Sequence, residues 1–514
     1  MRARALLLIV LLAGGATIAA ALLRDDTAGT APETPGGGTR GRELTLWTFD
    51  AERPYLPNPK KMAILLKSQL ERAGFRIRIV DHDRASHFEM TQNGEHDLAI
   101  LGWTGDTGDP DNFLYVLLGA QGAIVGSASN ISFYRDGEVT GWLVAAQVAR
   151  TREERRNLYL RAQRKIEEDA PLIPIAHGIQ AAAFRREVEG FSLHPTGQYL
   201  FDRTRVPGRT LRFARGSDST KLDPADITDG ESALVTENLF EGLVRYTREG
   251  VDVEPALATG WEVDPTGTVW TFALRERALF HDGTPVDAAA VVFSFERQRD
   301  PGHPHAPAAP VYWRDQFADV ERVEAIDPRT VRFTLKRPFA PFLTNLAMFS
   351  AGIVSPIAFE RAQTPFERNP VGSGPFRFVS WSVNDRIELE AFGGHWEGRP
   401  ACDRVTILTI PDNATRLVAL REGSIHGMKG INPQDLDEVR ADPTLRLLEQ
   451  PGMNVAYLAC NTMRPPLDDP LVRRSIARAI DKEAIRDLVY RGNAVVARSV
   501  LPPTLWAHPD YDGE

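Results

Sequence analysis

The clearest pattern of apolar and polar residues lies near the start of the chain and predicts a strand–helix–strand unit. Leu44–Phe49 alternates apolar and polar side chains, as a half-buried strand does. Asn58 and Pro59 then supply a helix cap and a first-turn residue, and Gly74 supplies the stop. Phe75–Ile79 alternates again as the next strand. The apolar face predicted for the helix consists of Met62, Leu65, Leu66, Leu70 and Ala73.

A short apolar run, Asp97–Leu101, predicts a buried strand that leads into a loop rich in glycine and aspartate, Gly102–Phe113. In α/β sheets, ligands bind at loops that follow the carboxyl ends of strands. The position and composition of this loop therefore predict a ligand site.

The pattern changes further along the chain. Thr151 and Glu154 form a predicted capping box for a helix that ends at Asp169, and Leu172–Ala176 follows as a strand. From Thr210 the chain has many short β segments interrupted by short helices. The segments expected there are the strands Leu211–Ala214, Val269–Leu274, Thr330–Leu335, Phe376–Ser380 and Ile387–Glu390, the helix Ala288–Gln298, and two helices near the end that start at Asp469 and Asp481.

Residues 1–24 are expected to be a signal peptide or a membrane anchor, and residues 25–42 a disordered linker. Arg2 and Arg4 precede Ala5–Leu23, which has 19 uncharged residues. Ala19–Ala21 offers a cleavage site and favours a removed signal peptide. As a helix, however, the run is ~28 Å long, close to the thickness of a bilayer core, so an uncleaved anchor stays open.

Composition narrows the function classes for the 514-residue chain. Its formal net charge of -9 argues against nucleic acid as a partner. The 2 cysteines, Cys402 and Cys460, cannot make a disulfide scaffold; buried free thiols are favoured over one disulfide, which stays open. No sequence motif of an enzyme, a cofactor site or a metal site occurs, and Asp109 and Asp111 do not fit a calcium loop. We therefore expect a binding protein without a cofactor.

The loop Leu101–Phe113 resembles the ligand-site loop of solute-binding protein family 5, the dipeptide- and oligopeptide-binding proteins of ABC importers. The resemblance extends over most of the chain from Leu44 to Asp512. Further segments that carry it are Arg53–Tyr55, Pro174–His177, Leu257–Val263, Phe280–Pro285, Val291–Phe295, Pro370–Phe376, Pro451–Val455 and Leu501–Trp506.

The resemblance implies an α/β, two-lobed periplasmic-binding-protein fold of the type II or cluster C kind, with a hinge. Segments that match the end of the family precede those that match its beginning, so a circularly permuted order is expected. Residues 43–178 and 453–514 would form the smaller lobe and residues 179–452 the larger one. The permuted junction, Asp202–Arg209, is short and polar. One short helix of the family has no counterpart, so apolar surface is expected on the smaller lobe.

By the same resemblance, Asp106 would take the ammonium group of a peptide ligand and Arg53 its carboxylate, with Trp103 and Tyr55 as aromatic walls. The implied protein is an extracytoplasmic, monomeric receptor that passes small peptides, dipeptides above all, to an ABC permease. Three alternatives stay open. Without the family resemblance, Asp106 is typical of a turn residue and not of a ligand site. The solute could be haem, a metal complex or another small molecule. The chain could also be a sensor or a remnant that no longer serves transport.

Overall fold

The computed structural model describes residues 42–361 and 364–510. The expected signal peptide or anchor, and the linker apart from Arg42, lie outside these residues. Within the described part of the chain, no helix is long and apolar enough to span a membrane. The description that follows concerns this part alone.

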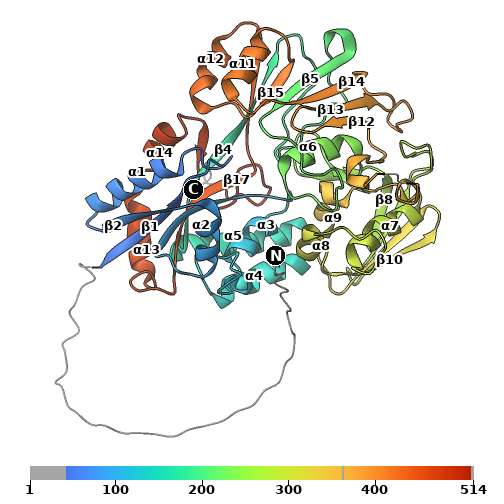
Figure 1. The fold of residues 1–514 in the computed structure, drawn as a ribbon. Coiled ribbons are helices and arrows are strands. Elements are labelled where there is room, and N and C mark those ends of the chain that lie inside the picture. The colour runs from blue at the N-terminus through green and yellow to red at the C-terminus, as the bar shows by residue number, and fades with distance from the viewer. Residues whose placement is uncertain (1–41, 362–363, 511–514) are drawn as a thin grey trace, which may run out of the picture. The chain divides into compact units, whose positions relative to one another are not determined.

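One mixed sheet of 12 strands dominates the fold (Figure 1). In spatial order its main path is β12 (Phe376–Ser382), β13 (Arg386–Ala391), β14 (Arg404–Thr409), β5 (Thr210–Arg215), β15 (Gly427–Lys429), β4 (Leu172–Arg185), β17 (Asn454–Cys460), β3 (Leu98–Thr104), β1 (Glu43–Phe49) and β2 (Arg76–His82). Two more strands, β16 (Leu445–Pro451) and β18 (Ala494–Val496), also pair with β4.

Strand β4 changes its partners halfway along its length. Its first half, to Gly178, pairs with β17 and β18. Its second half, from Ile179 to Arg185, pairs with β16 and β15. The chain crosses the same boundary again at Gly452–Met453, between β16 and β17. The expectation of a five-residue strand at Leu172–Ala176 was therefore too short, because β4 continues into the second group of strands.

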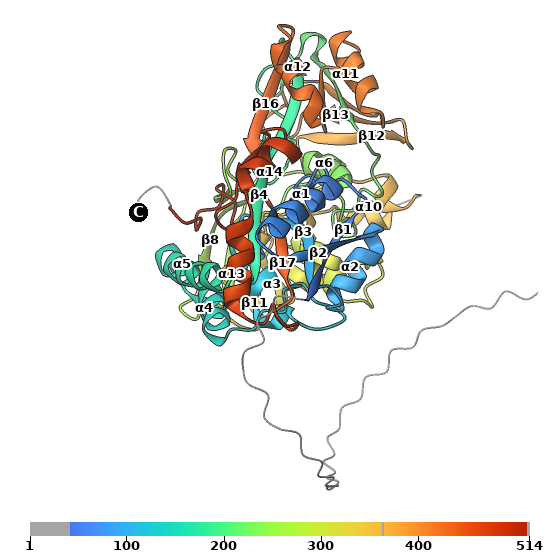
Figure 2. The same cartoon turned by 90° about the vertical axis from the view of Figure 1, so that its left-hand side faces the viewer.

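The two faces of the β1–β3–β17 region are covered by different helices (Figures 1 and 2). Leu46 of β1 and Ile100 of β3 pack into one core with α1 (Pro59–Arg72), α13 (Pro470–Ala479) and α14 (Lys482–Val489). Their neighbours Trp47 and Leu101 point to the other core, with α3 (Asp111–Leu118), α4 (Gly137–Val148) and α5 (Arg152–Asp169). Alternation of side chains along a strand accounts for this division.

The caps predicted for two helices are confirmed. The Asn58 side chain accepts a hydrogen bond from the Lys61 amide at 2.9 Å at the start of α1, and Gly74 follows the helix with a φ of +91°. Thr151 and Glu154 form the expected capping box of α5. Helix α2 (Arg84–Gln92) was not expected from the sequence.

The chain from Gly230 onward supplies the elements beside the large sheet. Two smaller sheets are β10 (Val320–Asp327), β11 (Thr330–Leu335), β9 (Val269–Leu274) and β8 (Ala258–Val263), and the pair β6 (Val244–Tyr246) and β7 (Val253–Pro255). Apart from α13 and α14, the α-helices after residue 229 are α6 (Gly230–Leu239), α7 (Ala288–Arg299), α8 (Val311–Gln316), α9 (Phe342–Asn345), α10 (Pro356–Glu360), α11 (Asn413–Arg421) and α12 (Leu436–Ala441).

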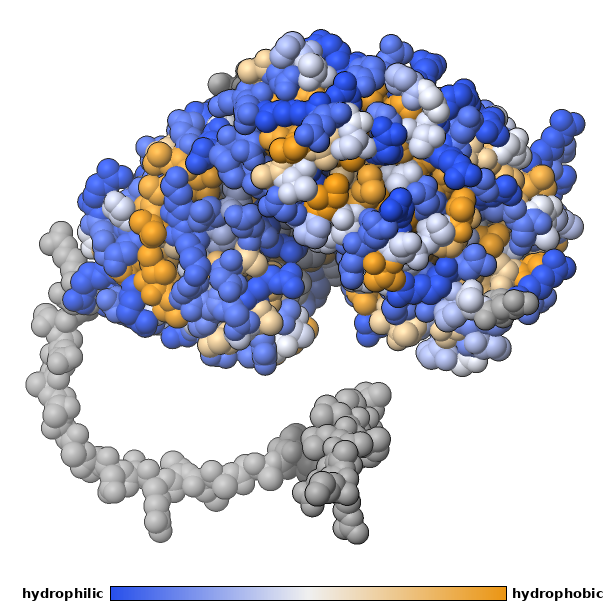
Figure 3. Space-filling view, turned by 45° about the horizontal axis from the view of Figure 1, so that its top comes forward, coloured by the Kyte–Doolittle hydropathy of each residue, from blue (hydrophilic) through white to orange (hydrophobic). Residues whose placement is uncertain are grey.

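Polar side chains cover most of the face in Figure 3, with apolar groups scattered among them. Some large apolar side chains of α1, α13 and α14 are nevertheless exposed: Ile64, Leu471 and Leu488. Cys402 and Cys460 are buried free thiols, as favoured from the sequence. Burial raises the pKa of both thiols to about 12, so both stay protonated at neutral pH.

Candidate functional site

A cavity of about 470 Å³ brings together residues from distant parts of the chain. Arg53, Tyr55, Trp103 and Asp106, which were singled out from the sequence, all line it. The opposite wall comes from α6, α8 and the segments around them. The residues of that wall are Thr196, Gly197, Gln198, Thr228, Asp229, Gly230, Ala233, Glu237, Tyr246, Tyr312, Met348 and Phe349.

Arg53 and Tyr55 are positioned by a tight turn that follows β1. The Arg53 amide donates to the Leu56 carbonyl at 3.0 Å, and the Leu56 amide donates back at 2.9 Å. The Tyr490 hydroxyl donates to the Tyr55 carbonyl at 2.7 Å and ties the turn to the end of α14. A Cβ at Gly102 would lie 2.2 Å from the Tyr55 ring, so glycine is needed there for the ring to lie against β3.

Arg53 presents a cation to the cavity. Its guanidinium lies 5.8 Å from the Tyr55 ring centroid, and its Nε is buried without a hydrogen-bond partner. Burial raises the pKa of Tyr55, and the charge and hydrogen bond of Arg53 oppose that rise. Within the described residues Arg53 forms no ion pair, so its charge is available to an anionic group in the cavity.

Asp106 is held by a small hydrogen-bond network at the end of β3. The Asn112 side-chain oxygen accepts from the Asp106 amide at 2.9 Å and from the Trp103 indole at 3.2 Å. The Tyr312 hydroxyl, from α8, donates to the Asp106 carboxylate at 3.2 Å. The ligand loop is thus fixed from within by Asn112 and contacted from the opposite wall by Tyr312.

The Asp106 carboxylate is costly to ionise in this environment. Burial raises its pKa to about 6, against the hydrogen bonds from Tyr312 and Asn112, which lower it. The nearby charge of Asp315 raises the pKa further. None of the groups of the described chain that shift this pKa is a cation, so a cationic group that entered the cavity would stabilise the ionised form.

The two other aspartates of the loop are engaged in structural contacts. Asp109 forms a buried two-point ion pair with Arg155 of α5, at 2.6 and 2.8 Å. Asp111 accepts from the Gln147 side chain at 3.1 Å, and burial raises its pKa to about 7. Among the described residues, no cluster of three potential metal ligands occurs.

Several residues of the site were not found from the sequence. Asn112 lies in the first turn of α3 and Tyr312 lies in α8, and neither element was expected. Tyr246 ties the loop to the opposite wall, because its hydroxyl accepts from the Gly108 amide at 3.1 Å and donates to the Thr344 carbonyl at 3.0 Å. Glu237 of α6 also lines the cavity. Asn112 lies within the predicted loop Gly102–Phe113, and this position is the one signal that could have suggested it.

Comparisons with known proteins agree with this architecture. The family model of bacterial extracellular solute-binding proteins, family 5, matches residues 23–124 and 252–514. Heme-binding protein A of Haemophilus influenzae is 36% identical over 306 residues, and the dipeptide-binding protein of Escherichia coli is 34% identical over 322 residues. The matches cover 56% and 59% of this chain, and 56% and 60% of the relatives. The chain thus spans little more than half the length of the relatives it matches.

A solved structure gives the same result. HbpA2 from Haemophilus parasuis is 32% identical and superposes with a TM-score of 0.54, over 57% of this chain and 62% of that one. This degree of identity and overlap places the common part of the two chains in one fold, an α/β arrangement with a large mixed sheet.

Proposed function

The chain belongs to the bacterial extracellular solute-binding proteins, family 5, and we propose that it captures small peptides outside the cytoplasmic membrane for an ABC importer. The observation that carries the proposal is the presence of Arg53 and Asp106 in the lining of one cavity, neither of them with an ion-pair partner in the described part of the chain. A free dipeptide has one cationic and one anionic end, and burial of either end requires an opposite charge. The protein acts as a binding protein and not as an enzyme.

In this function the ligand ammonium lies against Asp106 and the ligand carboxylate against the guanidinium of Arg53, whose planar fork suits a carboxylate. Trp103 and Tyr55 flank the two charged side chains and cover the apolar surface of the ligand. The protein recognises the two ends and the backbone of the ligand, and the ligand side chains contact the remaining walls of the cavity.

Capture proceeds by closure of two lobes around the ligand. Residues 43–178 and 453–514 form the smaller lobe, and residues 179–452 form the larger one. The change of partners along β4 at Gly178 supports the first crossing, and the passage from β16 to β17 supports the second. Asp106 and Tyr312 belong to different lobes, so their hydrogen bond is a contact that closure makes.

We further propose that the lobes are assembled in circularly permuted order. If two segments of this chain are exchanged relative to a relative, one alignment that follows chain order can match only one of the two segments. The matches to 56% of this chain and 56% of a relative, and to 57% and 62% in the structural superposition, support this order. In this order the exchanged segments join within Asp202–Arg209, which includes the exposed turn at Pro207–Arg209.

Replacement of Asp106 by alanine tests the ammonium site. Loss of one partner of a buried charge pair weakens binding by about 2–5 kcal/mol, so the Kd for a neutral dipeptide should rise at least tenfold in calorimetric titration. Asp468→Ala serves as the control, because Asp468 is exposed and does not line the cavity. An unchanged affinity of the Asp106→Ala protein would exclude the assignment. Binding of haem or a metal complex, with no binding of peptides, would favour another solute.

A further inference from the structure

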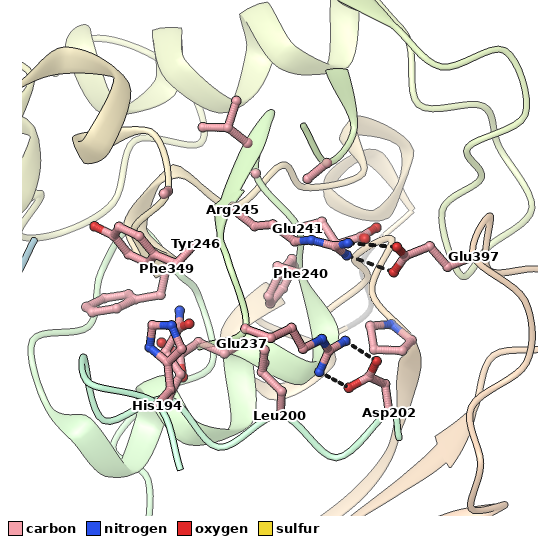
Figure 4. A pocket seen from close by; sticks show the side chains of 18 of the residues that line it. His194, Leu200, Asp202, Glu237, Phe240, Glu241, Arg245, Tyr246, Phe349 and Glu397 are labelled. Atoms are coloured by element: carbon pink, nitrogen blue, oxygen red, sulfur yellow. Dashed lines mark hydrogen bonds and ion pairs between the residues drawn. The ribbon is translucent and has the colours of Figure 1, made fainter. Parts of the chain in front are cut away.

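A second carboxylate faces the site from the opposite wall. Glu237, on α6, lines the main cavity and also a side chamber of about 280 Å³. The two cavities adjoin each other, because they share Gln198, Glu237, Tyr246, Met348 and Phe349 in their linings. In Figure 4, Glu237 lies beside His194 in this chamber, and two ion pairs lie across from it.

Glu237 differs from three other acids that line the chamber because, within the described residues, it has no counter-ion; the remaining acid, Glu249, is exposed. Asp202 pairs with Arg248 and Glu397 pairs with Arg245. Glu241 accepts hydrogen bonds from His395 at 3.1 Å and from Trp396 at 2.9 Å. For Glu237, no ion pair occurs within residues 42–361 and 364–510, and Lys429, the cation that acts on it, is itself paired with Glu231 at 3.2 Å.

The histidine beside Glu237 does not neutralise it. His194 Nε2 lies 2.9 Å from the Thr247 carbonyl and 3.0 Å from the Gly250 carbonyl, so its proton is directed to these oxygens. Its Nδ1 accepts from the Thr196 amide at 3.3 Å. Burial lowers the pKa of His194, which keeps the ring neutral at neutral pH.

The charges of the main cavity show what a neutral peptide leaves unsatisfied. Its ionisable acids and bases are Arg53, Asp106, Asp229 and Glu237. Asp229 caps α6 by accepting from the Ser232 amide at 2.8 Å, and it also accepts from the Thr220 hydroxyl at 2.8 Å. The two ends of a peptide match Arg53 and Asp106. Glu237 then remains as a half-buried carboxylate without a paired cation.

We propose that the protein prefers small peptides with a cationic side chain, whose charged end enters the side chamber and pairs with Glu237. This inference rests on the proposed peptide-binding function and adds the class of peptide. Lysine and arginine side chains have the required charge, and the apolar side chains of Leu200 and Phe240 in the same chamber suit their methylene stems.

The inference also predicts a proton release. Burial raises the pKa of Glu237 to about 7, although the Gln198 hydrogen bond and the charge of Lys429 lower it. At pH 7 a large share of the protein therefore holds a proton there. A cationic side chain favours the ionised carboxylate and expels this proton, whereas an uncharged side chain of similar length does not.

Calorimetric titrations with matched dipeptides test the preference. The probes are alanyl-lysine and lysyl-alanine, each compared with the dipeptide that has norleucine in place of lysine, at pH 7 in buffers of different ionisation enthalpy. We expect at least one lysine peptide to bind about tenfold or more tightly than its norleucine match and to release more protons. Glu237→Gln should reduce this ratio to below about threefold.

Glu321→Gln is the control variant, because it removes the same charge from an exposed position of β10. Comparison of proton release between the two peptides needs no variant, so the test holds even if Glu237→Gln does not fold. Equal affinity and equal proton release for lysine and norleucine peptides would overturn the inference and leave peptide capture intact. Failure of every dipeptide to bind the folded protein would overturn both.

Discussion

At the scale of single residues, the proposed binding of the ligand ammonium depends on how burial changes the charge of Asp106. Its carboxylate has a pKa of about 6, raised by burial, and the ammonium of a ligand binds only the ionised form. Protonation of Asp106 below pH 6 therefore competes with the ligand.

This competition predicts a pH dependence of affinity. For a neutral dipeptide such as alanyl-alanine, the Kd should be roughly tenfold higher at pH 5 than at pH 7, where its α-amino group is still largely charged. The sign follows from the raised pKa: the free protein must lose a proton to bind, so acid weakens binding. Titrations across this range measure the effect, and a constant Kd down to pH 5 would show that Asp106 does not hold the ammonium.

The sequence predicted this residue because the whole loop around it matches a family pattern. Arg53, Tyr55 and Trp103 were found in the same way, and the structure places them in the lining of one cavity. Glu237 and Tyr312 were missed, because each lies in a helix without a motif and reaches the cavity only through the tertiary fold. A single carboxylate on a helix is normally a solvated side chain, and only its burial without a cation distinguishes Glu237.

At the scale of elements, the ligand loop is attached to α5 by the ion pair of Asp109 and Arg155. Both side chains are almost completely buried, and Arg155 also donates to the Tyr159 hydroxyl at 2.9 Å and the Ala146 carbonyl at 2.9 Å. The capping box of α5 was predicted from local sequence, but the pairing of Arg155 with Asp109 was not, because it joins residues that lie 46 positions apart.

Asp109→Asn should therefore destabilise the protein. The change leaves the buried Arg155 without its anion, which typically lowers the free energy of unfolding by about 3–5 kcal/mol. Urea unfolding measures this loss. The double variant Asp109→Asn/Arg155→Met removes both charges and should recover part of the stability. A single variant that loses less than about 1 kcal/mol would show that the pair does not hold the loop.

Helices and strands with strong caps and alternation were predictable, whereas β4 was not predictable in full. The sequence marked Leu172–Ala176, but the strand continues to Arg185 through Gly178–Ala183, a stretch in which Ile179 is the one large apolar residue. Pairing with β16 and β15 on the far side keeps this stretch extended. Tertiary contacts therefore decided the length of the strand that connects the two groups of strands.

At the scale of the whole molecule, the proposed permuted order would make the turn at Pro207–Arg209 a junction that the fold does not require. The three residues of this turn are exposed, and the chain on both sides is held by pairing: β4 with β15, β16, β17 and β18, and β5 with β14 and β15.

A protease site inserted between Gly208 and Arg209 should consequently be cut without loss of the fold. After cleavage, the two fragments should elute together in size-exclusion chromatography and bind a dipeptide with an affinity within about threefold of that of the intact chain. Matched insertion and cleavage between Asn384 and Asp385, in the exposed connection of β12 and β13, provides a comparison within one group of strands. Separation of the fragments cut at Gly208 would show that the junction is needed to hold the lobes together.

The central claim is that the cavity between Arg53 and Asp106 binds the two charged ends of a small peptide. The most direct test is calorimetric titration of the protein with a free dipeptide and with its N-acetylated form. The account predicts saturable binding of the free dipeptide and an affinity at least about tenfold lower after acetylation, because the acetyl group removes the charge that pairs with Asp106. Equal affinity for both forms, or no binding of either by the folded protein, would contradict it.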